Sequence, residues 1–171
     1  MILIAALSLS LWSHLPALPR WGHRAAASAA AGVKLPARVG PWRIDGRWDR
    51  FAGTRACAIS APGVGFYRGV LLFRIGSRGD TRAALFRVDG GPARPVTEAF
   101  DTVEGLGVFP RRGWIVDPQG GEVVLPLAYA SGARTIAIRA AAGQRPRRFR
   151  VSGLDQAITL ARAAGCSTSP G

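Results

Sequence analysis

The chain is poor in the residues that carry out most acid–base and metal chemistry. Its 171 residues include two cysteines and two histidines, and both histidines, His14 and His23, lie near the N-terminus. No P-loop, HExxH site, GxSxG elbow or strand–GxGxxG–helix pattern occurs. If residues 1–31 are removed on export, the remaining chain contains no histidine for a Ser-His-Asp or Cys-His catalytic group. We therefore expect no metal, no cofactor and no enzymatic activity.

Lysine is also scarce, so arginine carries nearly all of the positive charge. A single lysine, Lys34, accompanies 22 arginines, and the net charge is +13. Such a surface attracts nucleic acid, anionic lipid or acidic polysaccharide. The alternative is compositional, because arginine in place of lysine beside abundant alanine and glycine is typical of a GC-rich coding sequence. Loss of residues 1–31 would remove only Arg20 and Arg24, so the basic character belongs to the rest of the chain.

No apolar run is long enough to span a bilayer unaided. The run Ile2–Trp12 has the length of a signal-peptide core, and Ala31 ends an alanine-rich stretch that suits cleavage. No basic residue precedes the run, so cleavage nearer Leu18, an uncleaved anchor and a buried N-terminal strand or helix are alternatives. We expect residues 1–31 to be a signal peptide or N-terminal anchor, and residues 32–40 to be a linker.

The two cysteines, Cys57 and Cys166, are the minimum for one disulfide. In an oxidising compartment they would pair and close a loop of about 110 residues, which stabilises the fold by roughly 4–5 kcal/mol in a chain-entropy model. The alternative is two unrelated buried thiols. Together with the N-terminal run, the cysteine pair predicts a periplasmic or secreted protein.

Short apolar segments separated by Gly, Pro and Asp turns predict a mainly β fold. Tyr67–Ile75 is expected to be a central strand that forms a hairpin with Ala83–Val88. Trp42, Ile44 and Trp48 would share one face of an earlier strand and plug the core. The sequence therefore predicts an antiparallel β-sandwich or open barrel with one C-terminal α-helix, forming a single domain over residues 41–167 with a disordered tail at 168–171.

The predicted helix lies between Phe149 and Cys166. Ser152 has the position of an N-cap, and Asp155 three residues later completes a capping box. Gly165 suits the left-handed position that follows a helix. The apolar stripe of this helix is Leu154, Ala157, Ile158 and Ala161.

Two basic clusters are the candidate ligand-binding sites. Arginine beside an aromatic ring suits phosphate or sugar-acid binding, because the planar guanidinium makes bidentate bonds and stacks. A solvated basic loop is the alternative. If Arg148 and Arg150 lie on one extended segment they share a face, and Phe149 points into the core. The candidates are Arg111, Arg112 and Trp114 in the first cluster and Arg145, Arg147, Arg148 and Arg150 in the second.

Carboxylates support a second hypothesis, a small hydrolase that acts on envelope glycan with a pair of acids. Most of them lie in turns or beside arginine, where turn capping and solvated ion pairs are ordinary roles. A third hypothesis, nucleic-acid binding, rests on net charge alone. The acidic residues are Asp45, Asp49, Asp80, Asp89, Glu98, Asp101, Glu104, Asp117, Glu122 and Asp155.

The chain resembles the invasion-associated locus B family of small exported proteobacterial proteins. The residues that carry the resemblance are Trp42, Cys57, Phe149, Gly153, Leu154, Ala157 and Ile158. The family usually has a further cysteine shortly after the first tryptophan, and Arg43–Gly46 contain none. The resemblance implies a β-rich, disulfide-containing envelope protein without an established reaction. We thus expect a binding or structural module for an anionic polysaccharide, lipid headgroup or envelope protein, with no nucleic-acid partner.

Overall fold

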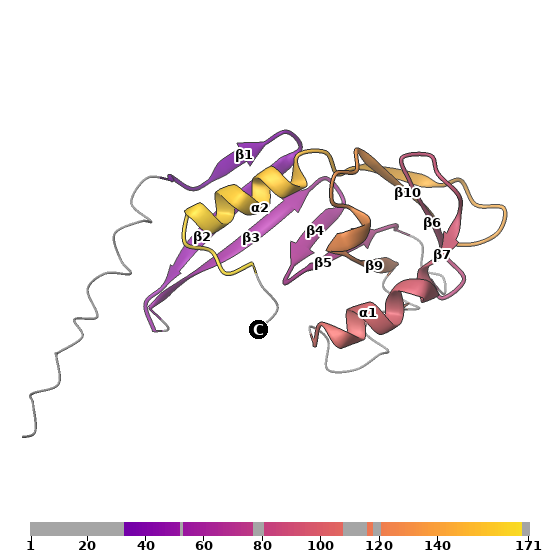
Figure 1. Ribbon diagram of the computed structural model, residues 1–171, viewed down its shortest axis with the longest axis horizontal. Helices are drawn as coiled ribbons and strands as arrows, with labels where there is room; N and C mark the ends of the chain where they lie inside the picture. The colour runs from indigo at the N-terminus through magenta and orange to yellow at the C-terminus, as the bar shows by residue number, and fades with distance from the viewer. Residues whose placement is uncertain (1–32, 52, 77–80, 108–115, 118–120, 169–171) are drawn as a thin grey trace, which may run out of the picture.

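The structure, a computed structural model, describes residues 33–51, 53–76, 81–107, 116–117 and 121–168 (Figure 1). It is mainly β, with two antiparallel sheets in a sandwich-like arrangement and a C-terminal helix, as the sequence predicts. One sheet has the strand order β1-β2-β3-β4-β5-β9-β8, and the other has the order β11-β10-β6-β7. The strands are β1 (Ala37–Val39), β2 (Trp42–Asp49), β3 (Thr54–Ala61), β4 (Val64–Tyr67), β5 (Val70–Arg74), β6 (Leu85–Val88), β7 (Arg94–Pro95), β8 (Val116–Asp117), β9 (Glu122–Pro126), β10 (Thr135–Arg139) and β11 (Arg147–Arg150). The helices are α1 (Phe100–Gly105) and α2 (Leu154–Ala163), with 3-10 turns at Val96–Ala99 and Leu127–Tyr129.

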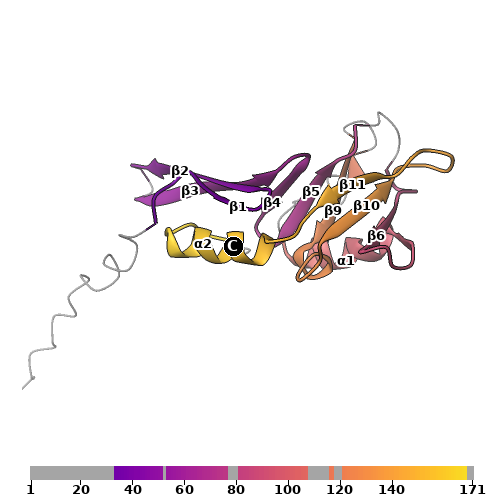
Figure 2. The ribbon, with the colours of Figure 1, turned by 90° about the horizontal axis from the view of Figure 1, so that it is seen from above.

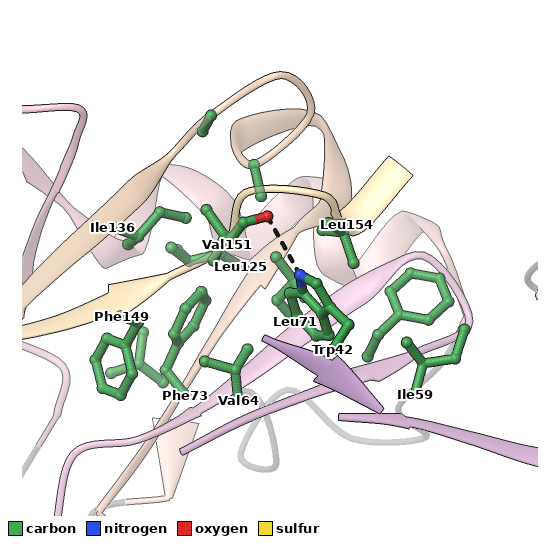
Figure 3. Packing of buried hydrophobic residues seen from close by; sticks show 14 of the residues in the cluster. Trp42, Ile59, Val64, Leu71, Phe73, Leu125, Ile136, Phe149, Val151 and Leu154 are labelled. Carbon is green, nitrogen blue, oxygen red and sulfur yellow. Dashed lines mark hydrogen bonds between the residues drawn. The ribbon is translucent and has the colours of Figure 1, made fainter. Parts of the chain in front are cut away.

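One face of the seven-stranded sheet packs against two different partners. Its first strands lie over α2, while β4, β5 and β9 lie against the four-stranded sheet (Figure 2). Between the sheets the rings of Phe73 and Phe149 meet edge to face, with centroids 5.1 Å apart. At the junction Trp42 is fully buried, and its indole Nε1 donates to the carbonyl of Val151 at 3.4 Å (Figure 3). The core is therefore continuous from the helix to the sandwich.

The C-terminal end of α2 is built as predicted, but its N-terminal end is not. Gly165 has φ +81°, and the N–H groups of Gly165 and Cys166 donate to the carbonyls of Arg162 and Ala161, which is a Schellman motif. At the other end Gly153 is the N-cap, with φ +79°, and no side chain caps the helix. The chain needs a left-handed residue to turn from β11 into α2, so the predicted Ser152 cap is wrong.

Asp155 also has a different role from the predicted capping box. Its carboxylate accepts from the backbone N–H of Gly132 at 3.0 Å and from the hydroxyl of Ser131 at 3.3 Å. The acid therefore fastens the turn before β10 to the start of the helix instead of capping the helix itself.

The predicted strand Tyr67–Ile75 is in fact the second half of a hairpin. Arg68 and Gly69 have φ +46° and +88°, the left-handed conformation of a two-residue hairpin turn between β4 and β5. The expected hairpin between β5 and β6 is wrong, because β4 and β9 occupy the two edges of β5. Strand β6 pairs with β10 and β7 in the other sheet.

A second helix, α1, covers the opposite face of the seven-stranded sheet. Val103 of this helix packs with Val70 and Val124, and Phe100 and Leu106 lie beside them. The sequence gives no sign of this short helix, because six residues are too few to show a helical repeat of apolar side chains.

The two ends of the predicted domain also need correction. Residues 37–39 form β1 and pair with β2, so the expected linker at 32–40 contains a strand of the sheet. At the other end Thr168 is buried, and its hydroxyl accepts from Nε of Arg162 at 2.6 Å, so it belongs to the fold and not to a tail. The remaining residues of the predicted tail, and the whole predicted signal segment 1–31, lie outside the described residues.

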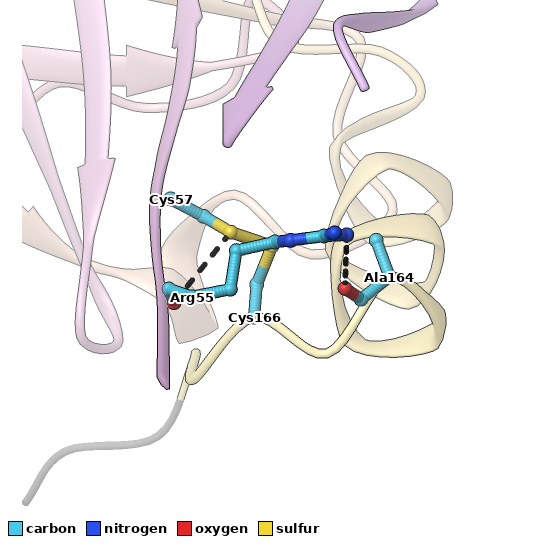
Figure 4. The surroundings of a disulfide bond; sticks show 4 residues. All are labelled: Arg55, Cys57, Ala164 and Cys166. Atoms are coloured by element: carbon cyan, nitrogen blue, oxygen red, sulfur yellow. Dashed lines mark hydrogen bonds between the residues drawn. A yellow bond between two sulfur atoms is a disulfide. The ribbon is translucent and has the colours of Figure 1, made fainter. Parts of the chain in front are cut away.

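Cys57 and Cys166 form a disulfide, as predicted, with their Cα atoms 5.6 Å apart (Figure 4). Beside it Nη1 of Arg55 donates to the carbonyl of Ala164 at 2.8 Å, so the end of α2 is fixed to β3 twice. A disulfide of this kind indicates an oxidising compartment outside the cytoplasm. Among the described residues no helix is long and apolar enough to cross a membrane.

Removing the disulfide should lower the stability of the fold markedly. The bridge spans 109 residues, and a loop of that length corresponds to about 4–5 kcal/mol in the chain-entropy model. The variant Cys57→Ser/Cys166→Ser should lose about that much free energy of unfolding in urea titrations. Under reducing conditions the wild-type protein should unfold at the same urea concentration as the variant. A variant as stable as the oxidised protein would show that the disulfide does not stabilise the fold.

Asp89 fixes the turn after β6 to the start of β10. Its backbone has φ +47°, and its carboxylate accepts from the N–H groups of Thr135 at 2.7 Å and Arg134 at 3.0 Å. These bonds, with that of Thr135 first, lower the pKa of Asp89 below its ordinary value of 3.8. The charged carboxylate is thus favoured by folding.

The pH dependence follows from that lowered pKa. Stabilisation by Asp89 is present above its ordinary pKa and is lost as the pH falls through the lowered pKa of the folded state. Asp89→Asn keeps a residue that tolerates a positive φ but removes the charge. Its melting temperature should be below that of the wild type at pH 7, and the difference should shrink in acid. Parallel melting curves from pH 7 to pH 2 would contradict this role.

Candidate functional site

The outer face of the four-stranded sheet carries a row of arginines. Register places Arg148 of β11 opposite Ala137 of β10, and Ala137 opposite Arg87 of β6. Side chains opposite each other on neighbouring strands share a face, so the two arginines flank a small alanine. The Cα atoms of Arg87 and Arg148 are two strand spacings apart, about 10 Å. Arg139 lies two residues along β10 and Arg150 two residues along β11, on the same face.

The sequence folds this way because each strand alternates strictly. Phe86, Ile136, Ile138 and Phe149 point inward and are buried, which leaves the arginines between them exposed to solvent. The inward residues supply the packing energy of the sheet. The arginines are consequently not needed to hold it together.

Arg87, Arg139 and Arg148 border an open groove of about 610 Å³. Its floor is made of small or apolar groups, and the loop between β10 and β11 forms one wall. Asp89 stands at the groove's margin, but its oxygens are already bonded to backbone N–H groups of the next strand. The lining residues are Leu85, Arg87, Asp89, Gly90, Ala93, Thr135, Ala137, Arg139, Gln144, Pro146 and Arg148.

Within the described ranges, three unpaired arginines line this one groove, whereas several arginines elsewhere form ion pairs. In the described part of the chain, the guanidinium groups of Arg87, Arg139 and Arg148 have neither a salt-bridge partner nor a hydrogen-bond partner. Elsewhere Arg43–Asp45, Arg74–Glu122 and Arg94–Glu98 form ion pairs at 2.8, 3.3 and 2.8 Å. Among the described residues, the groove therefore gathers three arginines that form no ion pair, which favours an anionic ligand.

Only part of the predicted site belongs to this groove. Arg148 lines it, and Arg150 lies on the same face, as expected for an extended segment with Phe149 in the core. The alternative of a solvated basic loop is wrong for Arg147, Arg148 and Arg150, which lie in β11. The first cluster, Arg111, Arg112 and Trp114, lies outside the described residues.

Arg145, Arg147 and Arg150 of the second cluster do not line the groove. Arg147 points the other way, donates from Nη1 to the carbonyl of Arg74 at 2.9 Å, and lies over the ring of Phe149. Its bond connects the two sheets, which is a structural role. Arg145 is an exposed loop residue and is not among the lining residues.

Sequence reasoning missed Arg87 and Arg139. Each is a single arginine within an apolar strand, LFRV or TIAIR, so neither belongs to a basic run. The usable signal was the alternation itself, because an arginine between two inward-facing residues must face outward. Their meeting with Arg148 depends on the order of the strands, which the sequence does not state.

The carboxylates of the described residues are mostly engaged in structural contacts. Asp45, Glu98 and Glu122 pair with arginines, while Asp89 and Asp155 accept from backbone N–H groups. Asp89 is the one acid among the described residues that line the groove, and a two-acid mechanism needs a second. Within the described ranges, no group of three or more His, Cys, Asp or Glu side chains is placed to hold a metal ion.

Comparison of the chain with protein-family models, with curated proteins and with solved structures finds no match. The arginine groove therefore stands as the candidate site on its own geometry, as a surface suited to bind an extended anionic ligand.

Proposed function

We propose that this protein is an exported, non-enzymatic binding module of the bacterial envelope, and that it holds an acidic polysaccharide across β6, β10 and β11. The observation that carries the proposal is the set of unpaired guanidinium groups of Arg87, Arg139 and Arg148 around one groove. The disulfide supports the export part, because it indicates an oxidising compartment. The resemblance to the invasion-associated locus B family implies the same location.

The spacing of the charges favours a polymer over a single phosphate or carboxylate. Arg87 and Arg148 lie on strands separated by β10, at about 10 Å between their Cα atoms, and Arg139 lies further along β10. A ligand that engages all three must present negative groups at several points. The small floor at Ala137 and Gly90 leaves room for sugar rings between the guanidinium groups.

Binding of a charged glycan at such an open site should be sensitive to salt. Exposed ion pairs are screened, so affinity for polygalacturonate should fall as sodium chloride rises from 20 to 200 mM. Dextran, which is neutral, should not bind at either concentration. Isothermal titration calorimetry with the full chain measures both. Absence of salt-sensitive binding to polygalacturonate would remove the proposed function.

The groove itself is tested by removing its charges. Arg87→Gln/Arg139→Gln should weaken polygalacturonate binding by about tenfold or more, since each lost charge-assisted hydrogen bond costs roughly 1 kcal/mol at an exposed site. The matched control is Arg38→Gln/Arg68→Asn, which removes two charges from the other sheet and keeps a residue that tolerates the positive φ of Arg68. Equal losses in both variants would show a general charge effect and reject the groove.

The same two variants separate glycan binding from nucleic-acid binding. A nucleic-acid binder would prefer a single-stranded oligonucleotide over polygalacturonate at equal salt. If the oligonucleotide binds more tightly and Arg87→Gln/Arg139→Gln removes that binding, the groove is correct and the ligand class is wrong.

A further inference from the structure

The hairpin of β2 and β3 ends in a tip that carries exposed aromatic and basic side chains. Trp48 is 57% exposed and Phe51 is fully exposed. They border a shallow depression together with Arg47 and Arg50. Exposure of two large aromatic rings to water is unfavourable, and clustered exposed apolar groups on a small protein mark an interaction surface.

The spacing of Trp48 from Trp42 and Ile44 predicts that Trp48 lies in the core, and this prediction is wrong. The fold explains why. Along β2 these residues share one face, and α2 covers that face. The Schellman turn of α2 ends at Cys166, whose disulfide partner Cys57 lies opposite Gly46. Trp48 lies two pairs further along the hairpin, past the end of the helix, so the sheet extends beyond the part that the helix covers.

The charge around the tip identifies the kind of partner that it fits. Residues 47–55 contain three arginines and one aspartate. Trp and Phe rings settle at the boundary between lipid headgroups and acyl chains, while arginines keep their guanidinium groups among anionic headgroups. We propose that this tip docks onto an anionic lipid bilayer, with Trp48 and Phe51 entering the interface and Arg47 and Arg50 contacting phosphates.

The position of the chain's N-terminal part agrees with this orientation. Leu35 packs over Gly46 at the hairpin, where an added Cβ would overlap its side chain. The first described strand and the hairpin tip lie at the same end of the long axis of the molecule (Figures 1 and 2). Leu35, among the first described residues, therefore lies at the end of the molecule that would face the bilayer.

A second copy of the chain fits the tip less well. Two aromatic side chains bury at most about 500 Å², whereas specific protein interfaces bury about 1,200 Å² or more. Two identical tips would also bring like-charged arginines together. A bilayer needs no such area, because it accepts a few aromatic side chains and supplies negative charge.

The inference is independent of the proposed glycan function. Strands β6 and β10 lie at the opposite end of the long axis from the hairpin tip (Figures 1 and 2). A protein that rests on the bilayer through the tip would hold its arginine groove away from the membrane. Loss of groove binding and loss of membrane docking can therefore be measured separately.

Hydroxyl-radical footprinting of the full chain tests the docking directly. Vesicles of phosphatidylglycerol and phosphatidylcholine should lower the oxidation of Trp48 and Phe51 several-fold. Tyr67 is the internal control, since it is 49% exposed and lies on the opposite face of the sheet. Its oxidation should not change. This readout is local, so it reports on the tip whatever the N-terminal residues contribute to vesicle binding.

A variant pair supplies the second measurement. Trp48→Ser/Phe51→Ser should reduce the fraction bound to anionic vesicles by at least about fivefold, because two interfacial aromatic groups are lost. Tyr67→Ser should bind as the wild type does, and Arg87→Gln/Arg139→Gln should keep the footprint at Trp48. Unchanged oxidation of Trp48 on vesicle-bound protein would overturn the proposal. Protection that appears without lipid and grows with protein concentration would also overturn it, in favour of a second copy.

Discussion

The disulfide and the helix that it anchors hold the rest of the structure in place. The segment from Arg147 to Cys166 begins as an edge strand of one sheet, crosses under Trp42, and ends as the helical cover of the other sheet. Because the same segment belongs to both halves, neither half can separate without exposing the core beneath α2. The bond between Cys57 and Cys166, with the Arg55–Ala164 hydrogen bond beside it, keeps the helix end from detaching. A small domain of this kind gains much of its stability from such a closure.

This arrangement also decides where the arginine groove and the exposed tip lie. Strand β11 lies next to β10, and β10 lies next to β6. The outward residues of these three strands therefore form a single basic face. At the other end of the molecule, the cover over β2 stops where the disulfide is made. The uncovered sheet continues to Trp48, and its aromatic face is left to solvent. One structural element thus creates both the groove and the exposed tip.

Local patterns in the sequence were enough to predict the fold class, the disulfide, the body of α2 and its end at Gly165. They failed wherever a distant partner decided the outcome. The tight turn at Arg68 could not be predicted from the apolar run around Leu71, because arginine rarely adopts a positive φ and its presence does not indicate a turn. Strand β5 was paired with β6 by proximity in sequence, but β9 takes that edge from about 50 residues away. The groove was half predicted for the same reason. Arg148 stood in a visible basic run, whereas Arg87 and Arg139 join it only through strand order.

The unpaired arginines are informative because the fold gains nothing from them. Inward-facing phenylalanines and isoleucines already supply the packing of β6, β10 and β11, and like charges gathered on one face raise the free energy of the folded state. Arg94 and Arg147 show what a structural arginine looks like in this protein, since each is fixed by a ring and by an oxygen acceptor. In the described part of the chain, Arg87, Arg139 and Arg148 have neither a ring contact nor an oxygen acceptor. An anion in the groove would remove their mutual repulsion, so binding and stability are linked at this site, and the ligand would stabilise the sheet that presents it.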